Sequence, residues 1–135
     1  MRRREFIPLL GGAAVAPLAA TAQTPPKIPR VGYIVGQSLT AAGHLIGALR
    51  QGLRELGWVE GRTIELEIRS AEGRPDRAAE LVAELVGLKV DVLVTGVSWA
   101  ALAAKNATRT IPIVMVAADP VGLGLVASLA RPGGN

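Results

Sequence analysis

The sequence predicts an α/β fold, a Rossmann-like open parallel sheet with strand order 2-1-3-4 and helices on both faces. Short β-branched apolar runs alternate with stretches whose apolar residues recur at helical spacing, as in strand–helix repeats. Apolar residues make up 50% of the chain but aromatic residues only 3%, so we expect an aliphatic core. The length of 135 residues suits one such domain.

The predicted strand order depends on a contrast between the second strand and the other three. Within the predicted strand 63–69, residues 64–69 alternate strictly between aliphatic and charged side chains, whereas residues 30–35, 90–94 and 110–116 are mostly apolar. Strict alternation gives a strand one solvent-exposed face, which favours a place at the edge of the sheet. Strand one therefore lies inside the sheet, between strands two and three.

Helices are expected between these strands. Apolar residues recur at helical spacing over residues 45–56, and Gly57 then provides a left-handed cap. Pro75 opens a second helix, and an Ala-rich third helix follows from Trp99. Residues 121–130 are long enough for one further short helix.

The amino terminus has the pattern of an export signal. Three arginines precede a mildly apolar run and a small-residue site that ends at Ala22, and Arg3-Arg4-Glu5-Phe6-Ile7 fits the twin-arginine pattern. We therefore predict a cleaved signal over residues 1–22, a proline-rich leader over 23–29 and an incomplete amino-terminal α/β lobe over 30–135. A membrane anchor is the alternative, but Pro8 and Pro17 interrupt a run that is already short for a spanning helix.

Charge and cysteine content limit the partners. Removing residues 1–22 takes away three arginines and one glutamate, so 12 basic and 10 acidic residues remain. This near balance, with few aromatic residues, predicts no nucleic-acid partner. The absence of cysteine excludes a lipid-anchored amino terminus, so we expect a soluble periplasmic protein that meets the twin-arginine translocase during export.

The candidate site lies where the strand order reverses, because open α/β sheets bind ligands outside the carboxyl ends of the strands at that point. We expect Ser98 to cap the third helix and leave its first amides for a ligand carboxylate. Trp99 is a candidate pocket wall, and Asp119 a candidate acceptor for a ligand ammonium group. The predicted ligand-binding residues are Gln37, Ser38, Thr95, Gly96, Ser98, Trp99 and Asp119.

Each of these residues also has a plain structural interpretation. Ser98 is equally suited to an ordinary helix cap without a ligand, Trp99 to core packing, and Asp119 to starting the short helix. The sequence contains no nucleophile–base pair, no metal-ligand spacing and no complete glycine fingerprint, and His44 is its single histidine. We therefore predict neither catalysis nor a cofactor or metal.

Five segments closely resemble the ABC-transporter substrate-binding proteins of the tryptophan/tyrosine-binding-like family. They are residues 53–62 (LRELGWVEGR), 69–77 (RSAEGRPDR), 111–114 (IPIV), 119–122 (DPVG) and 124–135 (GLVASLARPGGN). The resemblance implies a type I periplasmic-binding fold, in which two Rossmann-like lobes close on a small solute and pass it to a membrane permease. The implied function is the solute-binding component of an ABC importer, with an amino acid or related small carboxylate as the solute.

Two departures qualify the resemblance. Members of the family are considerably longer, so this chain corresponds to most of one lobe. Many members have Gly-Thr-Pro before the third helix, whereas this chain has Gly-Val-Ser-Trp at residues 96–99. The resemblance therefore does not identify the solute of this chain. An exported flavodoxin-like α/β enzyme or cofactor binder, and a truncated fragment without function, remain the alternative interpretations.

Overall fold

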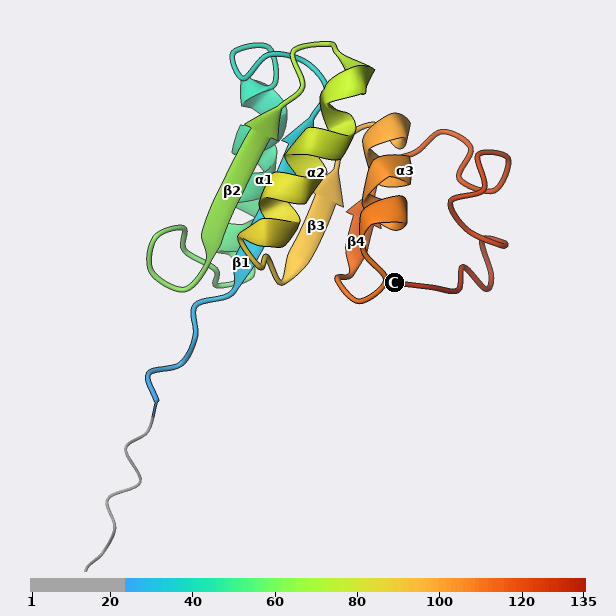
Figure 1. The fold of residues 1–135 in the computed structure, drawn as a ribbon. Coiled ribbons are helices and arrows are strands. Elements are labelled where there is room, and N and C mark those ends of the chain that lie inside the picture. Colours follow the sequence, from blue (N-terminus) through green and yellow to red (C-terminus); the bar gives the residue numbers. More distant parts are fainter. Residues whose placement is uncertain (1–23) are drawn as a thin grey trace, which may run out of the picture.

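The computed structural model describes residues 24–135, and the predicted signal peptide lies outside the described residues. The described chain forms a parallel sheet of four strands in the order β2-β1-β3-β4 (Figure 1). The predicted topology is therefore confirmed. The strands are β1 (Arg30–Val35), β2 (Glu65–Ser70), β3 (Val92–Thr95) and β4 (Ile113–Met115).

Helices cover both faces of the sheet, as predicted. Figure 1 shows α1 behind the sheet and the pair α2 and α3 in front of it. The second predicted helix begins with a short 3-10 turn, η1, because proline at its start fits a first helical turn. The helices are α1 (Gly43–Glu55), η1 (Pro75–Arg77), α2 (Ala78–Gly87) and α3 (Ser98–Ala107).

Alternation along β1 divides the core between the two faces. Ile34 packs with Leu85 and Leu93 under α2 and α3, whereas Tyr33 and Val35 pack under α1. Successive side chains of a strand point to opposite faces, so a central strand needs apolar residues at every position. These side chains are almost fully buried, and the core is aliphatic, as expected.

The two edges of the sheet differ in charge. On β2, Glu65 and Arg69 form ion pairs of 2.9 Å with Arg30 and Glu84, which place charge along that edge. At the opposite edge, residues 111–118 carry no charged side chain. Val114 is 56% exposed there, so only the β2 edge has charges that oppose pairing with another strand.

The segment after β4 does not form the predicted helix. Residues 121–130 adopt turns, in which Leu125 N donates to Pro120 O at 2.8 Å. Glycine is a poor helix former, and Gly124 takes a left-handed conformation (φ +68°) that ends the turn. The segment runs beside α3, where Lys105 Nζ donates to the carbonyl of Gly124 (Figure 1).

Candidate ligand-binding crevice

The carboxyl ends of β1 and β3 meet at the point where the strand order reverses. Ile34 lies opposite Thr95 in the parallel register, and Gly96 N donates to Ile34 O at 3.0 Å. The loop from β1 to α1 and the loop from β3 to α3 therefore start side by side. This is the place where a doubly wound sheet presents a ligand crevice.

The two loops are in contact at Gly36. A Cβ atom on Gly36 would lie 2.8 Å from Val97 Cγ1 and 3.5 Å from Trp99 Cζ2, so a larger residue would displace Val97. The indole of Trp99 also packs against the core cluster under α2 and α3. Trp99 therefore serves two purposes, because one side of the ring is core and its benzo edge borders the β1–α1 loop.

Helix α3 begins differently from the prediction. Val97, in extended conformation, is the residue before the helix, Ser98 is the first helical residue, and no side chain caps this end. The prediction that Ser98 is the cap is wrong, because its backbone has already entered the helix. Ala101 N donates to Val97 O at 3.2 Å, so the amides of residues 98–100 lie ahead of the first intrahelical bond. A carboxylate at such an end gains about 0.3–1 kcal/mol.

Gln37 and Ser38 form the β1–α1 loop. Gln37 O accepts a hydrogen bond of 2.8 Å from Ser70 Oγ, which fixes the main chain and leaves the half-buried amide side chain without a bond to a described residue. Ser38 Oγ accepts from Ala41 N at 3.3 Å. Ser38 thus supports the turn before α1, and Gln37 is the better placed of the two to contact a solute.

Thr95 and Tyr33 lie next to Gly96, where the β3–α3 loop begins. The Thr95 side chain is fully buried, and its Oγ1 has no hydrogen-bond partner among the described residues. Only its main chain therefore faces the loop. The Tyr33 hydroxyl lies 3.5 Å from the position a Cβ of Gly96 would take, and burial raises the pKa of Tyr33, so the phenol is neutral. Tyr33 was not predicted as a site residue because its place in an apolar strand indicates only core.

The side chain of Asp119 makes its hydrogen bond within its own loop and not with the β1–α1 or β3–α3 loop. Its Oδ1 accepts from Gly122 N at 2.9 Å, and its side chain is exposed. The end of β4 is nevertheless tied to β3, because Val116 N donates to Thr95 O at 3.0 Å. The structure thus joins the first two predicted loops, whereas the carboxylate of Asp119 stabilises the turn that follows it.

A third loop, unforeseen from the sequence, joins the crevice from β2. Gly73 N donates to Gly36 O at 2.7 Å and Ala71 N to Val35 O at 3.0 Å. Between them, Glu72 adopts a left-handed conformation (φ 54°), which costs a residue with a Cβ about 1–2 kcal/mol. The pattern Glu72-Gly73 signals a turn, but it does not show that Glu72 takes positive φ in addition to Gly73 (φ 72°).

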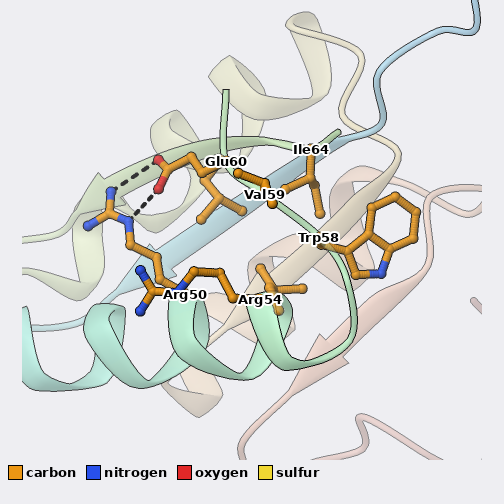
Figure 2. Close-up of a pocket in the computed structure, with 8 residues that line it drawn as sticks. Arg50, Arg54, Trp58, Val59, Glu60 and Ile64 are labelled. Atoms are coloured by element: carbon orange, nitrogen blue, oxygen red, sulfur yellow. Dashed lines mark hydrogen bonds and ion pairs between the residues drawn. The ribbon is translucent and has the colours of Figure 1, made fainter. Parts of the chain in front are cut away.

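A cavity of about 240 Å³ lies elsewhere, between α1 and the turn that leads into β2 (Figure 2). Figure 2 shows the guanidinium of Arg50 facing the carboxylate of Glu60, with two hydrogen bonds between them. This cavity is at the amino end of β2, away from the switch point. It is lined by Arg50, Leu53, Arg54, Trp58, Val59, Glu60, Ile64 and Leu66.

Two further searches concern the described residues alone. Within residues 24–135, no group of three or more His, Cys, Asp or Glu side chains is arranged to hold a metal ion. In the same range, no helix has the length and apolar character needed to span a membrane.

Comparison with known proteins identifies the family. Residues 32–135 match the family described as ABC transporter substrate binding protein. The chain belongs to this family. A tyrosine-binding protein of Clostridioides difficile (strain R20291) is 36% identical to this substrate-binding protein over 86 residues, which are 63% of this chain and 25% of that relative.

Solved structures share the fold of this substrate-binding protein. A conserved domain protein from Vibrio cholerae matches 81% of the chain with a TM-score of 0.75 and 35% identity. An ABC domain from Streptococcus pneumoniae in complex with L-Trp also matches 81%, with a TM-score of 0.73 and 26% identity. The chain spans 37% of the length of each of these structures.

Proposed function

We propose that this chain provides one wall of a binding site for a small solute, an amino acid or a related carboxylate. In this proposal the solute is captured in the periplasm and handed to an ABC permease of the inner membrane. The observation that carries the proposal is the contact between the β1–α1 and β3–α3 loops beside the unpaired amides of α3. Membership of the substrate-binding family supports it.

The proposed contacts follow from the chemistry of each group. The amides of residues 98–100 suit a carboxylate, because the end of a helix combines free donors with a positive dipole. The edge of Trp99 suits an apolar or aromatic part of the solute. Gln37, Ser38 and the main chain of Thr95 and Gly96 would complete the polar contacts, and the carboxylate of Asp119 would first have to leave Gly122.

The relatives support an amino acid as the solute. One relative is named a tyrosine-binding protein, and one similar structure contains L-Trp. In this proposal the indole of Trp99, in the loop sequence Gly-Val-Ser-Trp at residues 96–99, stacks against the ring of an aromatic solute. Export through the twin-arginine route, removal of residues 1–22 and a soluble periplasmic form without a lipid anchor belong to the same proposal.

Thermal melts of the chain with a panel of L-amino acids and small carboxylates test the proposal. A solute present at 100 times its dissociation constant adds about 2.7 kcal/mol to the free energy of unfolding. In this proposal the chain forms only one wall of the site, so it makes fewer contacts with the solute than a two-lobed site would. Each loss of about 1.4 kcal/mol of binding free energy weakens binding about tenfold, so the panel should extend to millimolar concentrations. If no solute raises the melting temperature at these concentrations, the binding proposal is wrong for this chain.

A further inference from the structure

We propose that Glu72 is the carboxylate that receives a cationic amine of the solute, so that the site selects amine-bearing carboxylates over carboxylates alone. This inference rests on the proposed function and deepens it. Asp119 was the acid predicted for this role, but its carboxylate is engaged by Gly122 N at 2.9 Å. Glu72 Oε1 lies 3.0 Å from the hydroxyl of Ser70, and the other carboxylate oxygen has no hydrogen bond to a described residue.

The charges around the β2–η1 loop leave Glu72 without a counterion. Arg74 pairs with Asp76 at 2.7 Å, and Arg69 pairs with Glu84 at 2.9 Å and with Glu67. Arg77 Nη1 is directed to the carbonyl of Ser70. Among residues 24–135, therefore, each arginine of this loop has a partner other than Glu72, whose exposed carboxylate keeps its negative charge uncompensated.

Main-chain bonds fix the place of this carboxylate relative to the crevice. The residues on either side of Glu72 donate to the end of β1, at 3.0 Å from Ala71 and 2.7 Å from Gly73. The hydroxyl of Ser70 lies 2.8 Å from Gln37 O and 3.0 Å from Glu72 Oε1. The carboxylate is thus one hydroxyl away from the β1–α1 loop, on its β2 side.

The two flanks of the β1–α1 loop therefore differ in electrostatic character. On the β3 side, the amides at the start of α3 favour a negative group. On the β2 side, Glu72 favours a positive group. An amino acid lying over Gly36 and Gln37, with its carboxylate turned toward α3 and its amine turned toward Glu72, would match both flanks.

Paired probes that differ only in the amine test this inference. L-tyrosine is compared with 3-(4-hydroxyphenyl)propionate, and L-tryptophan with 3-(indol-3-yl)propionate, by calorimetric titration of the full chain and its variants. In the unmodified chain the amino acid of each pair should bind at least about tenfold more tightly, the usual size of a hydrogen bond to a charged group. Glu72→Gln should remove this preference and leave the affinity for the deamino probe unchanged.

Two further variants separate the role of the charge from effects on the fold. Glu72→Gly suits the left-handed conformation at this position, so it keeps the loop and should also lose the preference. Glu80→Gln, which removes an exposed carboxylate on α2, should keep it.

Equal weakening of both probes in the Glu72 variants, or unchanged selectivity, would overturn the role of Glu72 and leave the proposed function standing. If the unmodified chain binds no member of either pair, the inference about Glu72 fails, whereas the proposed function fails only if no solute of the melting panel binds.

Discussion

Asp91 and Arg30 exchange two hydrogen bonds across the bottom of the sheet. The amide of Arg30 donates to Asp91 Oδ2 at 2.8 Å, and the amide of Asp91 donates to the carbonyl of Arg30 at 2.7 Å. Lys27 Nζ donates to the other carboxylate oxygen at 2.9 Å. Asp91, just before β3, therefore sets the register with which β3 pairs with β1.

Asp91→Asn should make the stability of the protein depend less on pH. The bond from the Arg30 amide, and then that from Lys27, hold the pKa of Asp91 below its usual value. A lowered pKa means that the carboxylate stabilises the fold above its unfolded pKa of about 3.9 and stops doing so as the pH falls through the folded pKa. The pair is partly exposed, so we expect a loss of at most about 1 kcal/mol at pH 7. Urea titrations at pH 7 and pH 3 measure this difference, and a loss of equal size at both values would contradict its origin in the charge.

Ser98→Pro should weaken binding of a solute carboxylate without unfolding the protein. Ser98 is the first residue of α3, a position at which proline is well tolerated, and the change removes one of the amides offered to the ligand. We expect a loss of affinity of at least about tenfold, the size of one hydrogen bond to a charged group. Calorimetric titration with the solute found in the panel measures this loss.

Ser98→Ala is the matched control for this prediction. It removes the hydroxyl but keeps the amide, and the hydroxyl makes no capping bond, so affinity should be nearly unchanged. A loss of the same size in both variants would assign the contact to the side chain instead.

Gly36→Ala should distort the crevice. The added Cβ would lie 2.8 Å from Val97 Cγ1, so Val97 and the start of α3 must move. Such overpacking typically lowers the free energy of unfolding by about 1–3 kcal/mol, and a solute should bind more weakly. Chemical denaturation and the ligand-dependent melt report the two effects separately.

Gly47→Ala provides the contrast. Gly47 is exposed within α1, an added methyl group would have no neighbour within 4 Å, and alanine favours a helix over glycine by about 1 kcal/mol. This variant should be more stable and bind as before. If Gly36→Ala behaved in the same way, the packing of Val97 would not determine the shape of the site.

Thr95→Val should leave the protein as stable as before or stabilise it by about 1 kcal/mol. The buried hydroxyl of Thr95 has no partner among the described residues, so valine of similar shape removes an unsatisfied group. Solute affinity should stay the same, because only the main chain of Thr95 faces the crevice. Thermal melts with and without solute test both points; destabilisation above about 1 kcal/mol would indicate that the hydroxyl has a partner.

The sheet was predictable from the sequence because burial leaves a direct mark on strand patterns. The charges of Glu65, Glu67 and Arg69 placed β2 at the edge, and that one inference determined the strand order. Gly57 was likewise predictable as the end of α1, because it adopts positive φ (+90°) after the helix. These features depend on local residue chemistry alone.

The details of the crevice were less predictable because they depend on contacts between loops distant in sequence. Ser98 was expected to cap α3, but the chain enters the helix one residue earlier, after Val97. Glu72 takes a left-handed conformation as well as Gly73, in a turn where both neighbours of Glu72 are bonded to the end of β1. Local propensity carries no information about such bonds.

The two ends of the sheet differ in how far side-chain ion pairs add to the main-chain bonds. At the amino end, Lys27–Asp91 and Arg30–Glu65 add partly exposed ion pairs, which salt weakens, to main-chain bonds such as Asp91 N to Arg30 O. At the carboxyl end, the loops of β1, β2 and β3 are joined by main-chain bonds such as Gly73 N to Gly36 O, which do not depend on side-chain identity. Substitutions of the charged residues can therefore change stability at the amino end of the sheet while the main-chain bonds between the binding loops stay in place. Stability and solute recognition can thus change independently during evolution.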